Sequence, residues 1–206
     1  MTNNSAKPDF ERAKAYALGR LQELPPVLTY HGIGHTRDHV VPAAEQLAAL
    51  EGCSADDLAL LSTSAWFHDL GYLERHDDNE VIAVRMAQDI LPKLNYSPQH
   101  IQVISGIIMA TRLPQTPHTQ LESIIADADL STLGHKDFLK HESALRQEFS
   151  QFGRIYDDKA WFSYQLEFLQ QHQYFSPSAH RCYDEQKRLN IAAVEKLLAE
   201  ASHGSP

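Results

Sequence analysis

Helical periodicity, interrupted by proline, glycine and capping residues, runs along almost the whole chain. Apolar residues recur three and four positions apart, and no pair of segments alternates with the period of two that is typical of strands. Pro25-Pro26, Pro92 and Gly134 end three segments, and the S-x-x-D pattern of Ser54 and Asp57 begins another. The pattern predicts an all-α fold. The expected helices span about 9–23, 35–52, 55–69, 79–91, 98–108, 119–133, 135–152, 157–172 and 177–201.

Length and composition indicate one domain over residues 1–206. The chain is long enough for one substantial core, has 43% hydrophobic and 22% charged residues, and contains no repeat, low-complexity segment or clear linker. No apolar run approaches the roughly 20 residues of a membrane-spanning helix, and the N-terminus lacks the apolar stretch of a signal peptide. Cys53 and Cys182 are isolated thiols, so no disulfide framework is expected. We therefore expect a cytoplasmic protein without a membrane partner.

The charge and histidine content narrow the classes of function. The net charge is −9, with no dense Lys/Arg stripe, so binding to nucleic acid through phosphate contacts is not expected. The chain has 12 histidines, and histidine is the commonest metal ligand and the usual acid or base near neutral pH. This count favours a metal or catalytic site but does not locate one.

The stretch AWFHDLGY, residues 65–72, places an ionisable pair in an apolar segment. At about 100° per residue, Asp69 falls on the inward face that begins at Leu58, and His68 lies near the direction of Leu61. In IIADADLSTLG the same test puts Asp129 on the flank of the apolar face, whereas Asp127 points away from it. Two buried carboxylates beside an imidazole need a positive charge between them, and His and Asp both ligate divalent cations.

A further ligand is expected from TYHGIGHTRDHVV, where three histidines stand four residues apart. Gly32 and Gly34 place His31 in a turn before the helix, and His35 lies in the first helical turn. His39 is one turn deeper, and the spacing alone does not choose between His35 and His39.

These residues resemble the H…HD…D signature of the HD-domain metal-dependent phosphohydrolases, which are all-α. The likeness extends over YHGIGH, WFHDLGY, the Asn-Glu pair at 79–80 and DADLSTLG, and LRQEF at 145–149 is similar to a bacterial group of predicted HD-superfamily phosphohydrolases. It implies a motif-bearing core at about 27–134 and a C-terminal helical extension at about 135–201. By this resemblance the metal ligands are His35, His68, Asp69 and Asp129.

The resemblance also implies a reaction. His31 matches a histidine that protonates the leaving oxygen, and Glu80 is similar to an acidic residue that orients water. Asp69 is expected to accept a proton, and Arg112, beside a proline-broken loop, to offset phosphate charge. The implied function is metal-dependent hydrolysis of a small phosphorylated metabolite, such as a nucleotide, at a phosphomonoester, pyrophosphate or cyclic phosphodiester bond.

One departure bears on the metal count. Two-metal members carry a further histidine where this chain reads ATR, with Ala110 in its place, and His100 and His118 stand beside no matching motif. We expect one divalent transition metal, namely Mn, Fe, Co, Ni or Zn, with Mg also possible. Two alternatives are a metal-stapled binding protein without turnover, which binds a nucleotide or a partner, and a di-iron oxygenase, against which Ala110 speaks. The remaining histidines are expected at the surface, at positions 76, 100, 118, 135, 141, 172, 180 and 203.

Overall fold

The computed structural model describes residues 7–203, and all of the regular elements in this range are helical. The all-α prediction is confirmed. The predicted domain of 1–206 includes residues 1–6 and 204–206, which lie outside the described residues. The helices are α1 (Phe10–Leu21), α2 (Val41–Leu50), α3 (Ala55–Phe67), α4 (Asn79–Ile90), α5 (Pro98–Met109), α6 (Gln120–Asp129), α7 (Phe138–Gln151), α8 (Asp158–Gln171) and α9 (Pro177–His203).

Within residues 7–203, four shorter turns join these helices. A π-helical turn, η1 (His35–Val40), leads directly into α2, and its end is marked by a hydrogen bond from the Val41 amide to the Thr36 carbonyl, five residues earlier. Three 3₁₀ turns follow α3, α4 and α6. They are η2 (Leu70–Leu73), η3 (Leu91–Leu94) and η4 (Ser131–Gly134).

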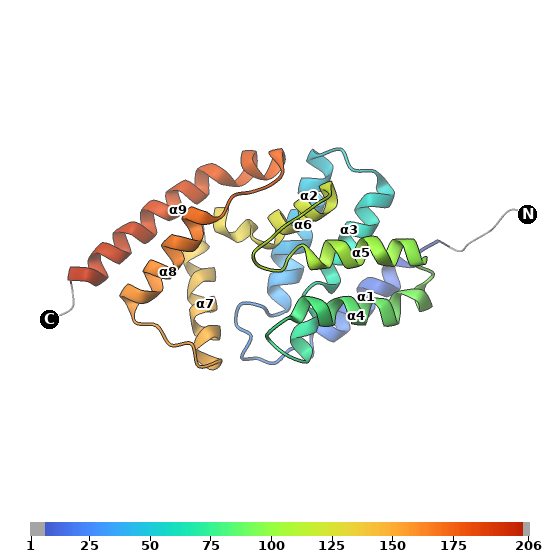
Figure 1. The fold of residues 1–206 in the computed structure, drawn as a ribbon, viewed down its shortest axis with the longest axis horizontal. Coiled ribbons are helices and arrows are strands. Elements are labelled where there is room, and N and C mark those ends of the chain that lie inside the picture. Colours follow the sequence, from blue (N-terminus) through green and yellow to red (C-terminus); the bar gives the residue numbers. More distant parts are fainter. Residues whose placement is uncertain (1–6, 204–206) are drawn as a thin grey trace, which may run out of the picture.

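The elements form two packed groups (Figure 1). Helices α1–α6 gather around α3, which contacts α1, α2 and α5, while α8 lies along α9 at the other end of the molecule. α7 stands between the second group and the chain segment that precedes η1 (Figure 1). The C-terminal extension is therefore placed to reach the segment that carries His31 and His35.

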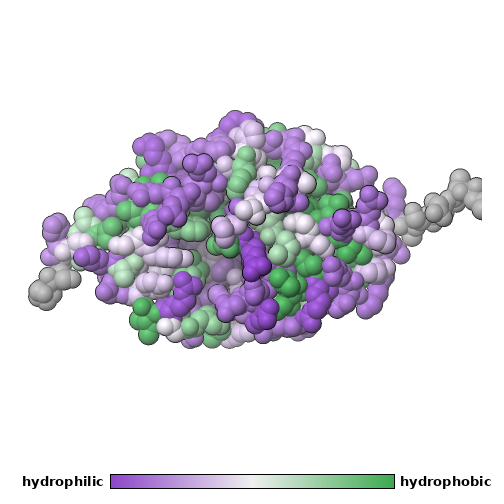
Figure 2. All heavy atoms as spheres, in the orientation of Figure 1, coloured by the Kyte–Doolittle hydropathy of each residue, from purple (hydrophilic) through white to green (hydrophobic). Residues whose placement is uncertain are grey.

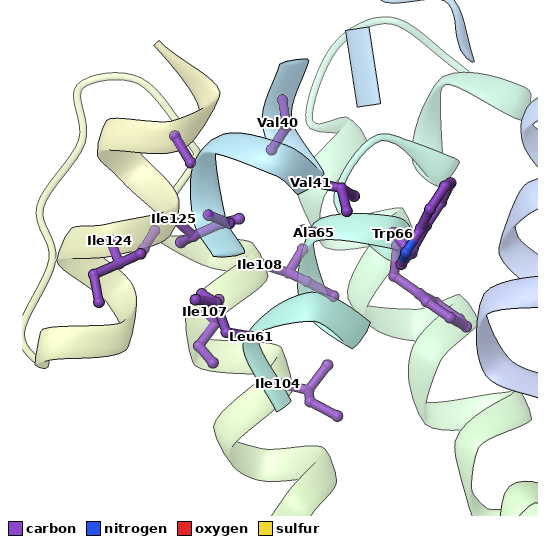
Figure 3. Close-up of a cluster of buried hydrophobic side chains, with 14 of the residues drawn as sticks. Val40, Val41, Leu61, Ala65, Trp66, Ile104, Ile107, Ile108, Ile124 and Ile125 are labelled. Carbon is purple, nitrogen blue, oxygen red and sulfur yellow. The ribbon is translucent and has the colours of Figure 1, made fainter. Parts of the chain in front are cut away.

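The larger group is held by one apolar core (Figure 3). Leu61 and Phe67 of α3 are fully buried, and each such side chain stabilises the fold by about 1.5–3 kcal/mol relative to an exposed one. Tyr174 and Ala179 of the extension are buried in the same cluster, so the extension packs against this core as well as within itself. A smaller apolar cluster lies where α8 and α9 pack against η4 and the start of α7. Its buried members are Leu133, Phe138, Leu169 and Val194.

Burial differs from the sequence-based expectation at several polar positions. Asp127 was expected to point away from the core, but it is fully buried and accepts hydrogen bonds from the amides of Phe175 and Ser176, both at 2.8 Å. The reason is that the connection between α8 and α9 covers the face of α6 that periodicity assigned to solvent. Likewise, five histidines predicted at the surface are half-buried, and His76 is so because Glu148 of α7 lies against it. The five are His76, His100, His135, His141 and His172.

The face of the molecule shown in Figure 2 carries mostly hydrophilic side chains, with hydrophobic ones in separate groups. Among the described helices, none is both long enough and apolar enough to cross a membrane.

Gly71 allows the turn after the His-Asp pair to touch the start of α4. A Cβ atom built on Gly71 would lie 1.8 Å from the carbonyl oxygen of Asn79, a backbone atom that cannot move aside cheaply. Gly19 of α1, in contrast, is exposed and has nothing within 4 Å of such an atom.

We therefore expect Gly71→Ala and Gly19→Ala to change stability in opposite directions. Gly71→Ala should lower the free energy of unfolding by about 1–3 kcal/mol because it overpacks a backbone contact. Gly19→Ala should raise it by about 0.5 kcal/mol because alanine favours the helix. Urea unfolding followed by circular dichroism measures both, and equal stability of Gly71→Ala and the wild type would contradict the close approach.

Candidate metal centre

Three chain segments bring two imidazoles and two carboxylates together. His68 ends α3, with Asp69 next to it, His35 begins η1, and Asp129 is the last residue of α6. The His35 Nε2 atom lies 2.9 Å from Asp129 Oδ1 and 3.8 Å from Asp69 Oδ2. The His68 Nε2 atom lies 3.2 Å from Asp69 Oδ2 and 3.5 Å from Asp129 Oδ1. All four residues predicted as ligands thus share one site, whereas His39 lies with His135 and His141 instead.

The cluster is almost closed to solvent and its polar atoms lack partners. The exposed fraction is 1% for His68 and 4% for Asp69. The His68 Nδ1 atom lies 2.8 Å from the carbonyl oxygen of Ala65 and therefore donates its proton there. In the neutral form of the ring, which is the form that ligates a metal, Nε2 is therefore an acceptor facing two carboxylates. That nitrogen, His35 Nδ1 and Asp69 Oδ2 are all buried without a hydrogen-bond partner.

The electrostatics of the cluster point to a missing positive charge. Burial lowers the pKa of His68, but Asp69 and Asp129 outweigh this and raise it well above 6.5. Burial raises the pKa of Asp129, but hydrogen bonds to His35 and His68 hold it well below 3.8. A bound divalent cation would satisfy the same oxygens and nitrogens. Two imidazole nitrogens and two carboxylate oxygens fit such an ion, so the residues present suit the metal that the sequence predicts.

His31 lies beside this cluster and is fixed by Glu148 of α7. Glu148 is fully buried, and its Oε1 atom accepts a hydrogen bond of 2.6 Å from His31 Nδ1. Its Oε2 atom accepts from the amides of Tyr30 (2.9 Å) and His31 (3.0 Å). Burial lowers the pKa of His31, but the hydrogen bond and charge of Glu148 outweigh it and raise the pKa above 6.5.

Glu148 received no role from the sequence, although LRQEF drew attention to its surroundings. His76 is a second addition, since it was expected at the surface yet lies against the same carboxylate, with its Nε2 atom 3.6 Å from Glu148 Oε1. Tyr72 stacks on His31 with the ring centres 4.6 Å apart. The ligand atoms of His31, His76 and Glu148 lie within 4.8 Å of one another, so the His31 surroundings are a second polar cluster beside the first.

A cavity of about 480 Å³ opens onto both clusters. Asp69, Asp129 and His31 line it, and Glu80 and Arg112 line it as the sequence predicted. Glu80 is half-buried, and burial raises its pKa above 4.5. Arg112 is exposed and pairs with Asp78 at 2.5 Å, so it stands at the rim. Arg154, which the sequence did not single out, lines the same cavity.

The position expected for a further ligand is filled by Ala110. Ala110 is buried at the end of α5 and offers no ligand atom. His100 caps the start of α5, and His118 is exposed. Neither histidine lines the cavity. The expectation of one metal at this centre stays a prediction.

Two solved structures share this architecture. A crystal structure of a predicted HD superfamily hydrolase from an uncultured Thermotogales bacterium matches with a TM-score of 0.61, covering 90% of this chain and 91% of that one at 17% identity. The chain has the fold of the HD superfamily. A crystal structure of a Lactobacillus plantarum protein matches with a TM-score of 0.57, covering 97% of this chain and 91% of that one at 21% identity.

In sequence, no family model and no curated protein matches the chain. The two solved structures confirm the resemblance to HD-domain proteins at the level of the fold. The assignment of the ligands depends on the geometry of the buried cluster.

The ligand assignment predicts that Asp129→Ala and Asp69→Ala each lose metal while keeping most of their helical circular dichroism. Removal of one carboxylate should weaken metal affinity by more than about tenfold, because even residues that only support ligands contribute that much. Metal content measured by elemental analysis after gel filtration tests this.

Asp127→Asn is the matched control, since Asp127 is buried on the same helix but binds backbone amides. It should retain its metal. Full metal content in Asp129→Ala would refute the assignment.

Proposed function

We propose that the protein is a metal-dependent phosphohydrolase acting on a small phosphorylated metabolite, such as a nucleotide. The observation that carries this proposal is a buried set of two histidines and two aspartates with unpartnered atoms, opening onto a cavity of about 480 Å³. The Thermotogales protein with the same fold is described as a predicted hydrolase, which supports the same class of reaction.

In this proposal His35, His68, Asp69 and Asp129 hold one divalent metal, of the group Mn, Fe, Co, Ni and Zn, or else Mg. Such an ion supplies Lewis acidity, which lowers the pKa of a coordinated water and polarises a phosphoryl group. Asp69 accepts a proton from the attacking water through the carboxylate oxygen that does not ligate the metal. Glu80 orients that water from the cavity wall.

His31 is the proposed general acid. Glu148 Oε1 accepts a hydrogen bond from the Nδ1–H group of His31, so the other ring nitrogen, Nε2, is the one that can donate to a leaving oxygen. The negative charge of Glu148 also keeps the ring protonated to a higher pH than an isolated histidine. Glu148 acts through His31 and is therefore a positioning residue.

The cavity walls suggest a substrate with a charged end and an apolar end. Arg112 and Arg154 line the same cavity as Asp69 and Asp129, and their charges suit the phosphate oxygens of a substrate. An adjoining cavity of about 240 Å³ shares His31 and Tyr72 as walls and continues beneath α7 and α8. A nucleotide fits this division, because its base would occupy the apolar part. The aromatic side chains lining that part are Phe138, Phe149, Tyr164 and Phe168.

The experiment that tests this proposal measures phosphate and pyrophosphate release from a panel of nucleotides and sugar phosphates. Metal-stripped protein is reloaded separately with Mn, Co, Ni, Fe, Zn and Mg, and Asp69→Ala is the blank. We expect metal-dependent turnover that disappears in Asp69→Ala, with nucleotides preferred over sugar phosphates. Firm metal binding without turnover of any substrate would instead favour the non-catalytic binding protein.

The role of His31 predicts a dependence on the leaving group. His31→Gln should lower kcat by about 10²–10⁴-fold on a substrate with a basic leaving oxygen, because that oxygen needs protonation. The loss should be far smaller on a nitrophenyl phosphate, whose leaving group departs as an anion. Equal losses on both substrates would exclude the general-acid role.

Glu148→Gln tests the positioning role through the pH profile. The protonated form of His31 is the active one, so activity falls as pH rises through its pKa. Removal of the carboxylate charge lowers that pKa, and the fall in kcat/KM on the alkaline side should therefore begin at a lower pH than in the wild type. An unshifted alkaline limb would show that Glu148 only supports the fold.

A further inference from the structure

A second group of imidazoles lies apart from the predicted metal ligands. His39 comes from η1, His135 follows η4, and His141 lies in the first turns of α7. Their ligand nitrogens all lie within 4.8 Å of one another. We call this group the three-histidine cluster. It shares no residue with the set of His35, His68, Asp69 and Asp129.

The rings of the cluster face one another across the junction between the motif-bearing core and the C-terminal extension. The ring centres of His39 and His141 are 4.6 Å apart, and those of His39 and His135 are 5.9 Å apart. His135 and His141 complete the triangle at 6.5 Å. Nitrogens this close, contributed by three separate elements, could ligate one ion together.

Two further observations point to a ligand. The Nε2 atom of His141 is buried and has no hydrogen-bond partner of acceptable geometry. The carboxylate of Asp137 stands 3.2 Å from that same nitrogen. Three imidazoles within 4.8 Å suit a zinc ion, and the exposed Asp137 carboxylate beside His141 could complete a tetrahedral set of nitrogen and oxygen ligands by a change of its side-chain rotamer.

The protonation of the cluster agrees with this chemistry. Burial lowers the pKa of His39, and the neighbouring His141, His35 and His135 lower it further. Burial also lowers the pKa of His135 and His141, although Asp137 opposes it. A lowered pKa favours the neutral ring, which is the form that ligates a metal.

We propose that His39, His135 and His141, with Asp137 as the fourth ligand, form a second metal site that binds zinc. The site joins η1 to the start of α7. Since α7 also carries Glu148, the zinc would fix the extension in the position that holds His31. The role of this zinc ion would be structural, because four protein ligands leave no coordination position open for water or a substrate.

Zinc stoichiometry of metal-stripped full-length protein, measured by elemental analysis after gel filtration, tests the site. Zinc is the probe, and Asp129→Ala is used to weaken the predicted metal centre. We expect two equivalents in the wild type, one in Asp129→Ala, one in His141→Ala and none in the double variant. His180→Ala is the control, since His180 is an exposed histidine that pairs with Asp184 in a single helix. It should keep both equivalents.

Two additional measurements separate loss of the site from loss of the fold. Circular dichroism of the stripped proteins should be the same in the wild type, His141→Ala and His135→Gln. Zinc should raise the Tm of Asp129→Ala but not that of Asp129→Ala/His141→Ala, because only a protein with the cluster gains binding energy in the folded state. With cobalt in place of zinc, Asp129→Ala should show the strong visible absorption of a four-coordinate site.

The proposal is overturned if His141→Ala and His135→Gln both fold and keep the full zinc stoichiometry of the wild type. It is also overturned if Asp129→Ala binds no zinc while its fold is intact. Neither outcome depends on turnover, so the result stands apart from the test of phosphohydrolase activity.

Discussion

The rest of the site is arranged around the Nε2 atom of His68, which is buried and has no hydrogen-bond partner. Because Nδ1 is committed to the Ala65 carbonyl, Nε2 turns toward two carboxylates in a space nearly closed to water. Such an arrangement of buried acceptors is costly unless a cation lies among them. The apolar residues of α3 hold His68 in this position. The fold therefore stabilises a site that is unfavourable when it is empty.

The C-terminal extension supplies what the motif-bearing core lacks. Glu148 reaches the backbone of Tyr30 and His31 as well as the ring of His31, so it sets both the course of the chain and the direction of the imidazole. The same extension supplies the aromatic wall of the adjoining cavity. Substrate selectivity would thus lie mainly in α7 and α8, whereas the four predicted ligands of the catalytic metal lie in the core.

The sequence was sufficient to predict the features that depend on residues a few positions apart in the chain. The capping pattern at Ser54 marks the start of α3, and the helical spacing places His68 and Asp69 inward, since both features depend on residues a few positions apart. Asp127 was misjudged because its partners lie 48 and 49 residues away, and helical periodicity describes only one face. Glu148 was missed because it meets His31 across 117 residues. Contacts over such separations leave no periodic trace in one sequence.

The π-turn η1 sets a length requirement on the segment between His31 and α2. It fits one more residue into its turn than an α-helix would, as the Val41–Thr36 hydrogen bond shows. Because the wider turn takes up the extra residue, loss of a single residue here would restore an ordinary helical turn with little rotation of His35 relative to α2. Gain of a further residue would instead rotate His35 by about 100° relative to α2. With Tyr30 tied to Glu148 on one side and α2 packed in the core on the other, no slack remains to absorb that rotation. Over evolutionary time, the segment should therefore accept the loss of a residue more readily than the gain of another.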